Sequence, residues 1–173
     1  MRTTMQKQQY RALYSVSPST FWSELCLSLD YQRELYMACL GCESMEVVRN
    51  DGDAATGVHR ALRFRKPIDA PLAVRKMFGD AVTMEEEGTF DPSAQSFTFT
   101  YRPPMLADRL FITGRMQVTP HNGGVEVVTN TEFRCDLFGL GGILELFALN
   151  AAKESMQDKQ RFTERYIVDK GLS

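Results

Sequence analysis

The alternation of hydrophobic and polar positions divides most of the chain into strands. From Glu43 to Cys135 apolar residues recur at every second position, the period of a strand with one buried face. The pattern predicts a first strand at Gln9–Val16 and six more at Glu43–Arg49, Gly57–Arg65, Ala81–Phe90, Ser96–Tyr101, Arg109–Thr119 and Val125–Cys135. Turn residues separate several of them, at Asp51-Gly52, Asp91-Pro92 and Asn122-Gly123-Gly124. Short connections of this kind favour an antiparallel meander.

Helical spacing replaces strand spacing in three places. Ser17 and Pro18 have the residue types of an N-cap and a first helical position, and a second short helix at Tyr31–Leu40 would end at Gly41. The C-terminal run Leu140–Val168 predicts a helix roughly 40 Å long, because small or apolar residues recur three or four apart. These residues are Leu144, Phe147, Ala148, Ala151, Ser155, Phe162 and Tyr166. The fold class is therefore α+β: a curved antiparallel seven-stranded sheet, two short helices after the first strand, and a long C-terminal helix over the sheet.

The inner face of the long helix has small residues at its centre. Ala148, Ala151, Ala152 and Ser155 lie between larger residues at both ends. Because protein interiors are close-packed, either the sheet supplies large side chains opposite these positions or a cavity is left beneath them. The sequence leaves both alternatives open.

Polar residues occur on strand faces that should point inward. Arg60 shares a face with Val58 and Leu62, and Glu86 shares one with Met84 and Phe90. If their two strands pair symmetrically about the 67–80 loop, Arg60 lies near Glu86. Buried charges without partners are costly, so these groups are expected to pair or to face water in a cavity. A bulge that turns one of them outward is the alternative.

The two ends of the predicted sheet differ in character. In a meander successive connections fall at alternate ends, so segments 67–80, 102–108 and 136–142 gather at the end where the long helix starts. They are rich in apolar residues and carry or adjoin basic ones, at Lys66, Arg75, Lys76, Arg102 and Arg109. This end is interpreted as a pocket entrance or a membrane-touching edge, formed by Phe78, Met105, Leu106, Phe138 and Leu140. The alternative is that these residues only cap the core.

Composition narrows the class of protein. A chain of 173 residues is expected to form one domain, 1–173 with a core at about 8–169, and its net charge of −2 does not favour nucleic-acid binding. The polar N-terminus shows no secretory signal, and no apolar stretch is long enough to span a bilayer. Four cysteines are expected to be reduced, so a cytoplasmic location is predicted.

The sequence contains no convincing motif for catalysis or metal binding. It lacks a phosphate-binding glycine loop and a Gly-x-Ser-x-Gly elbow, and neither its two histidines nor the Cys39–Cys42 spacing forms a metal-binding cluster. No catalytic residue, metal or cofactor is therefore predicted. An enzyme would have to use Glu86 and Arg60, with Tyr101 or Tyr14 as a proton donor.

Two local segments carry a resemblance to a known superfamily. They are the helix entry Ser17-Pro18-Ser19-Thr20-Phe21-Trp22 and the run Phe133–Gly142 that leads into the amphipathic C-terminal helix. With the order of elements, they resemble the START-like helix-grip (SRPBCC-type) superfamily over nearly the whole chain. The resemblance is nearest to an uncharacterised START-like family with a segment similar to Lys66–Gly79, and more distant to VASt domains.

This resemblance implies a hydrophobic pocket between the sheet and the long helix. Together with the residue pattern it predicts binding or transfer of a lipid or other hydrophobic small molecule, with transient contact to an anionic membrane surface. A polyketide cyclase or aromatase, and a co-chaperone-like protein-binding module, are the alternatives. The predicted ligand-binding residues are Arg60, Glu86, Phe97, Phe99, Tyr101, Ile112, Met116, Thr129, Thr131, Phe147, Ala148, Ala151 and Ser155.

Overall fold

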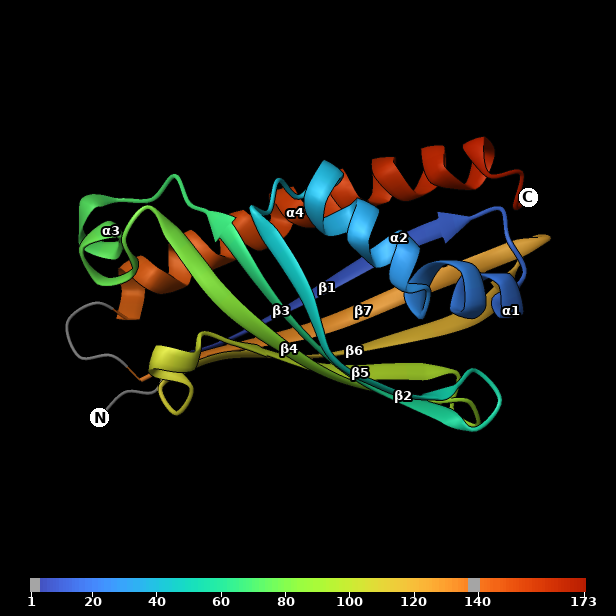
Figure 1. Cartoon of the computed structure of the whole chain (residues 1–173), viewed down its shortest axis with the longest axis horizontal. Helices are drawn as coiled ribbons and strands as arrows, with labels where there is room; N and C mark the ends of the chain where they lie inside the picture. The colour runs from blue at the N-terminus through green and yellow to red at the C-terminus, as the bar shows by residue number, and fades with distance from the viewer. Residues whose placement is uncertain (1–3, 137–140) are drawn as a thin grey trace.

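The computed structural model describes residues 4–136 and 141–173 and contains the predicted seven-stranded sheet (Figure 1). The strands are β1 (Thr4–Tyr14), β2 (Ser44–Asp53), β3 (Gly57–Pro67), β4 (Ala81–Asp91), β5 (Ser96–Arg102), β6 (Leu110–His121) and β7 (Gly124–Cys135). Their order across the sheet is β1-β7-β6-β5-β4-β3-β2, and every neighbouring pair is antiparallel. Strands β2 to β7 form the predicted meander, and β1 pairs with β7.

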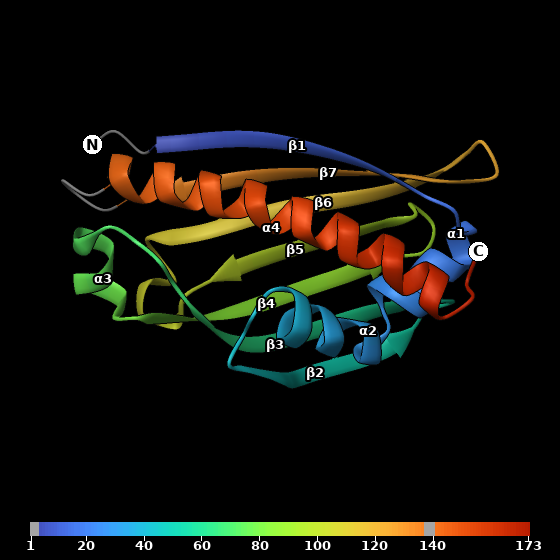
Figure 2. The same ribbon diagram turned by 90° about the horizontal axis from the view of Figure 1, so that it is seen from above.

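The long helix and the two N-terminal helical segments lie on the same face of the sheet (Figures 1 and 2). Helix α1 (Pro18–Thr20) continues into the π-helical turn η1 (Phe21–Cys26), and α2 (Leu29–Glu34) continues into η2 (Leu35–Cys39). Helix α4 (Gly141–Asp169) runs the length of the sheet, oblique to the strands, while α2 lies towards the β2 side. The sheet therefore forms a floor, with α4 above it and α2 beside α4.

The residues predicted to start and stop the short helices do so. Ser17 Oγ accepts a hydrogen bond from the backbone nitrogen of Thr20 at 3.1 Å, with Pro18 at the first helical position. Gly41 follows η2 with a φ of 66°, a left-handed conformation that glycine adopts at little cost. These two signals are confirmed, but the second helical segment begins earlier than expected, at Leu29, where Ser28 Oγ accepts a hydrogen bond from the backbone nitrogen of Tyr31.

One prediction for a connecting segment was wrong. Asp51 and Gly52 belong to β2, where they pair with His59 and Val58, and the turn lies at 54–56. The Asp53 carboxylate fixes this later turn by accepting hydrogen bonds from the backbone nitrogens of Ala55 and Thr56. The 67–80 connection also contains a short helix, α3 (Leu72–Phe78), and a 3-10 turn, η3 (Pro104–Leu106), follows β5.

Helix α4 is held by hydrophobic clusters at its two ends. Near its C-terminus, Ile167, Phe162 and Tyr166 join the large cluster built by the α1 and α2 segments and the sheet. Near its N-terminus, Leu144 and Phe147 pack with residues of α3, β6 and β7. Between these two anchors no residue from 146 to 162 is fully buried. The middle of the helix is thus the least tightly packed part of its length.

Candidate functional site

The centre of the sheet remains partly accessible although helices cover that face. Phe99, Tyr101, Ile112 and Thr131 all point inward, yet each is only half-buried. A close-packed interface would bury such residues completely. Space that water can enter therefore remains on the inner face, at the middle of the sheet.

Two glycines allow aromatic rings to lie flat against the strands at this place. Gly88 on β4 and Gly114 on β6 are the cross-strand neighbours of Phe99. A Cβ at Gly114 would lie 2.2 Å from the Phe99 ring, and a Cβ at Gly88 would lie 2.1 Å from the Phe97 ring. The two rings thus lie over the glycines, along the sheet, instead of standing up towards α4. Sequence alternation placed both phenylalanines inward but gave no signal of how their rings lie.

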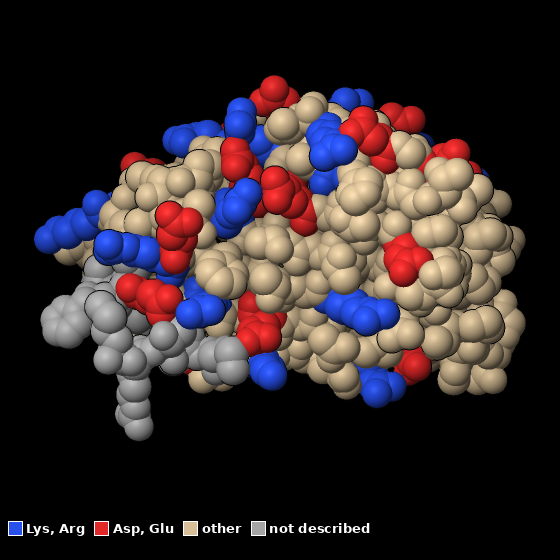
Figure 3. All heavy atoms as spheres, turned by 90° about the horizontal axis from the view of Figure 1, so that it is seen from below, with Lys and Arg blue, Asp and Glu red and all other residues tan. Residues whose placement is uncertain are grey.

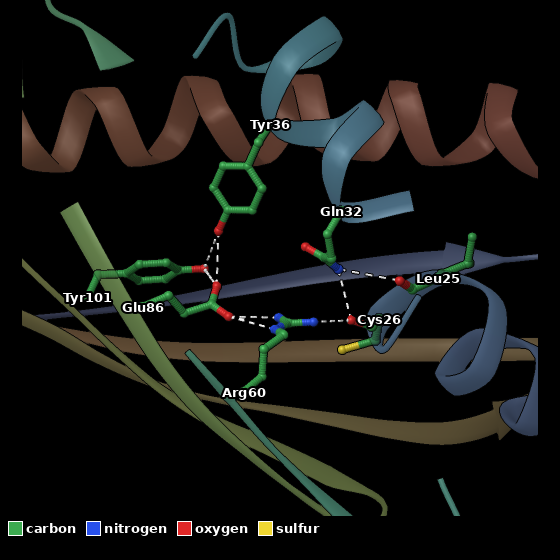
Figure 4. Close-up of polar contacts among 7 residues, drawn as sticks. All are labelled: Leu25, Cys26, Gln32, Tyr36, Arg60, Glu86 and Tyr101. Atoms are coloured by element: carbon green, nitrogen blue, oxygen red, sulfur yellow. Dashed lines mark hydrogen bonds and ion pairs between the residues drawn. The ribbon is translucent and has the colours of Figure 1, made fainter. Parts of the chain in front are cut away.

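A buried ion pair lies on the inner face of the sheet, next to the N-terminal helical segments (Figure 4). Arg60 on β3 donates hydrogen bonds from Nε and Nη2 to Glu86 Oε1 on β4, at 3.0 Å and 2.7 Å. The strands pair with Leu62 opposite Glu86 and without a bulge, so both side chains point inward. This confirms the predicted pairing of Arg60 with Glu86 and excludes the bulge between their strands.

Two tyrosines complete the coordination of the Glu86 carboxylate. Tyr101 on β5 and Tyr36 on η2 donate to Oε2 at 2.6 Å and 3.0 Å, and their hydroxyl oxygens are 3.3 Å apart. The remaining Arg60 nitrogen, Nη1, donates at 2.6 Å to the backbone oxygen of Cys26, which also accepts from Gln32 Nε2 at 2.8 Å. The cluster joins the sheet to both N-terminal helical segments.

The protonation states in this cluster follow from its contacts. Burial by itself would raise the pKa of Glu86, but the charge of Arg60 and the hydrogen bonds from Tyr101, Arg60 and Tyr36 lower it below its ordinary value. Burial also raises the pKa of Tyr36 and Tyr101, and the adjacent Glu86 carboxylate raises both further. Glu86 is therefore held ionised, while the two phenols keep their protons.

Lys159 on α4 is an inward-facing residue that sequence analysis missed. It is only partly exposed and lies one turn before the fully buried Thr163, whose hydroxyl donates to the Lys159 backbone oxygen at 2.6 Å. Burial lowers the pKa of its ammonium group, which also interacts electrostatically with Cys26, Glu86 and Arg60. The inner face of α4 was predicted from apolar and small residues. Because Lys159 is charged, it was not included in that face.

The predicted ligand-binding residues separate into two groups in the structure. The fully buried ones are Arg60, Glu86, Phe97, Met116 and Thr129. The half-buried ones are Phe99, Tyr101, Ile112, Thr131, Phe147, Ala148, Ala151 and Ser155. The predicted set thus combines partly exposed residues with residues of the packed core.

The predicted entrance lies at the end of the molecule formed by α3, η3 and the start of α4 (Figure 2). Phe78 and Leu106 are half-buried there and pack into the cluster around Val74. Met105 is 67% exposed, and Leu72 on α3 and Leu146 on α4 are similarly open. Phe138 and Leu140, the other two predicted entrance residues, lie outside the described residues.

The opposite face of the sheet is polar and carries both signs of charge (Figure 3). Arg63 lies between Glu46 and Glu85, and Arg65 pairs with Glu43. A shallow groove on this face is lined by polar residues of β1, β6 and β7, including Lys7, Thr113 and Glu132. Among residues 4–136 and 141–173 no group of histidine, cysteine or acidic side chains is arranged to hold a metal ion. Nor, within those ranges, is any helix both long and apolar enough to cross a membrane.

Comparisons with known proteins match this architecture. A family model described as "Protein of unknown function (DUF2505)" matches residues 9–167. No curated protein sequence matches the chain. The protein TTHA0849 from Thermus thermophilus has a similar structure, with a TM-score of 0.68 and 16% identity over 95% of this chain and 98% of that one.

Two further solved structures have the same fold. The Zhui aromatase/cyclase from Streptomyces sp. R1128 gives a TM-score of 0.64 with 12% identity, over 95% of this chain and 96% of that one. A START superfamily protein from Mycobacterium smegmatis gives 0.59 with 12% identity, over 94% and 98%. At such identities the likeness shows the fold alone, and the fold is the helix grip of START-like proteins.

Proposed function

The chain belongs to the DUF2505 family of proteins of unknown function, and from that premise we propose that it binds a hydrophobic small molecule or lipid between the sheet and α4. The observation that carries this proposal is the partial exposure of Phe99, Ile112 and Thr131 on the inner face of the sheet. Side chains on the inner face of a covered sheet are expected to be fully buried unless space is left for another molecule.

The character of the lining favours an apolar ligand with a polar end. Aromatic and aliphatic groups form the floor, and small residues of α4, including Ala151 and Ser155, lie above it. Each buried methylene of a ligand would contribute about 0.8 kcal/mol to binding. The Arg60–Glu86 cluster and Lys159 would lie at one side of the bound molecule.

Enzymatic chemistry is the second candidate, because an aromatase/cyclase shares the fold. Glu86 accepts four hydrogen bonds from Arg60, Tyr36 and Tyr101, which makes it a weak base, and its low pKa makes it a poor acid. This arrangement favours ligand binding over acid–base catalysis by Glu86, Arg60 and a tyrosine.

The finer proposal is that the ligand is exchanged at an anionic membrane surface. Leu72, Met105, Ile143 and Leu146 expose large apolar side chains at the α3 end of the molecule. Arg75 and Lys76 lie in the last turn of α3, beside these side chains. Exposed apolar groups next to cations suit the interface of an anionic bilayer.

Native mass spectrometry of the purified protein, with organic extraction of any bound compound, tests the proposal. Ala151→Phe would fill the space from the helix side, whereas Glu154→Phe places the same ring on an exposed position of α4. We expect Ala151→Phe to abolish uptake of an apolar ligand with the fold intact, and Glu154→Phe to leave uptake unchanged. Unfolding of the Ala151→Phe variant would instead indicate a packed site and contradict the proposal.

A further inference from the structure

The second helical segment, α2 and η2, lies beside apolar side chains that it does not cover completely. Tyr36 on η2 and Leu62 on β3 are buried in one cluster, and Met45 and Phe64 next to them are only partly buried. The rings of Tyr36 and Phe64 are 4.6 Å apart, and Met84, the neighbour of Phe64 on β4, is also half-buried. Large apolar side chains of the inner face thus stay partly exposed at the edge of this segment.

The hydrophobic effect alone favours a different position of the segment. Burial of apolar surface is the main force that packs helices onto a sheet. A shift of η2 over Phe64 and Met84 would remove more apolar area from water, so this force favours the shift. Because the segment does not adopt that position, another interaction holds it where it is.

The buried cluster around Arg60 and Glu86 provides this interaction (Figure 4). It contacts the helical segments at two points: Tyr36 donates to Glu86 Oε2 at 3.0 Å, and Arg60 Nη1 donates to the backbone oxygen of Cys26 at 2.6 Å. On the sheet, two further hydrogen bonds join Arg60 to Glu86, and Tyr101 donates to the same carboxylate. A shift of the second helical segment would break the Tyr36 contact, and buried polar groups that lose a partner are costly.

Both contacts on the helix side come from π-helical turns. Cys26 is the last residue of η1, and Tyr36 is the second residue of η2. A π turn is rare and appears mostly as a local departure within an α-helix, frequently at a functional site. The backbone therefore departs from α-helical geometry at the residues that meet the cluster.

A buried ion pair contributes little to stability compared with apolar residues of the same size, because desolvation offsets the attraction of the charges. We infer that the Arg60–Glu86 cluster instead fixes the position of the second helical segment, and so keeps Phe64 and Met84 accessible on the inner face. Without the cluster, η2 moves over these side chains and closes this part of the face. The inference goes beyond the proposed function, because it concerns the protein without a ligand.

Two variants weaken the cluster in different ways. Tyr36→Phe removes the hydrogen bond to Glu86 and keeps the ring. Arg60→Met combined with Glu86→Leu removes both contacts with the helical segments and leaves no buried charge behind. Tyr31→Phe is the matched control, because it removes the hydroxyl of another buried tyrosine of the same segment, which hydrogen-bonds to Thr163 on α4 and not to the cluster.

Hydroxyl-radical footprinting of the ligand-free proteins measures the accessibility of single side chains. Mass spectrometry gives the oxidation rate of each methionine and phenylalanine. We expect Tyr36→Phe and the double variant to lower the rates at Phe64 and Met84 several-fold, and to leave the rate at Met105, which is 67% exposed, unchanged. Tyr31→Phe should keep the wild-type rates at all three residues.

Unchanged rates at Phe64 and Met84 in both cluster variants would show that apolar contacts alone fix the segment. Faster oxidation there would show that the cluster holds the segment over these residues instead of away from them. Either result would overturn the inference, and neither would decide whether the protein binds a hydrophobic ligand.

Discussion

Gly114 on β6 lies directly beneath the ring of Phe99, its cross-strand partner on β5. A Cβ at this position would come within 2.2 Å of the ring, closer than any side chain tolerates. Phe97 covers Gly88 on β4 in the same way, so a pair of aromatic rings lies along the floor of the sheet. Two positions without a side chain therefore determine how close these rings lie to the strands and how much of the space above the sheet they leave open.

Gly114→Ala should force the Phe99 ring upward into that space. We expect a loss of stability of about 1–3 kcal/mol from overpacking, and a reduced capacity for an apolar ligand. Chemical denaturation and native mass spectrometry measure the two effects. Adding Phe99→Leu to Gly114→Ala should restore both.

Gly142→Ala provides the matched control, because nothing lies within 4 Å of a Cβ at Gly142 on α4. It should leave ligand capacity unchanged and stabilise the helix by up to about 1 kcal/mol. If Gly114→Ala behaves like Gly142→Ala, the Phe99 ring can move aside without cost. The close contact between Phe99 and Gly114 then does not limit the space above the sheet.

The Arg60–Glu86 pair should contribute far more to stability than the ion pairs of the outer face. Arg60→Met leaves the Glu86 charge buried without its cation, which is expected to cost about 3–5 kcal/mol. Arg65→Met breaks a pair with Glu43 in which both side chains are about half exposed, and should cost less than about 1 kcal/mol. Urea denaturation of both variants makes the comparison, and similar losses would contradict it.

The stability of the fold should also depend on the ionisation of Glu86. Its pKa is lower in the folded protein than its ordinary value of 4.5, so the unfolded chain binds the proton more readily. The stabilisation is therefore complete above the unfolded pKa and is lost as pH falls through the folded pKa.

Comparison of the wild type with Glu86→Gln isolates this contribution. The difference in free energy of unfolding should be largest near neutral pH and should shrink below about pH 4.5. Denaturation series from about pH 3 to pH 7 measure it. A difference that stays constant over this range would mean that Glu86 is not the group responsible.

The basic residues at the α3 end should determine binding to anionic vesicles. Arg75→Glu combined with Arg102→Glu reverses two charges near the exposed Leu72 and Met105, so co-sedimentation with phosphatidylserine-containing vesicles should weaken at least several-fold. Arg33→Glu combined with Arg161→Glu makes the same change on α2 and α4, away from that end, and should have little effect. Equal binding by both double variants would remove the membrane proposal but not the internal site.

The sequence predicted the fold because the signals that determine it are local. Strand period, the Ser17 cap and Gly41 gave element boundaries within a few residues, and symmetric pairing about the 67–80 connection placed Arg60 beside Glu86. The turn after β2 was misplaced because Asp51-Gly52 has turn composition, whereas the hydrogen bonds of Asp53 select a later position.

The interior features were harder to predict because they depend on contacts between distant elements. A lysine in a helix usually faces solvent, so Lys159 gave no sign of lying inside until α4 was placed over the sheet. Gly88 and Gly114 look like weak points of a strand in sequence, and their role becomes visible only with the rings that cover them.

The pairing of β1 with β7 also affects the order in which the parts of the protein fold. Gln9 on β1 and Asn130 on β7 are joined by a hydrogen bond although 121 positions separate them in the chain. As the ribosome delivers the chain from its N-terminus, the first strand has no neighbour to pair with until the last strand has emerged. Contacts so distant in sequence slow folding, because a long loop must close before they form. The meander of β2 to β7 is thus free to form first, and β1 and α4 close the site last.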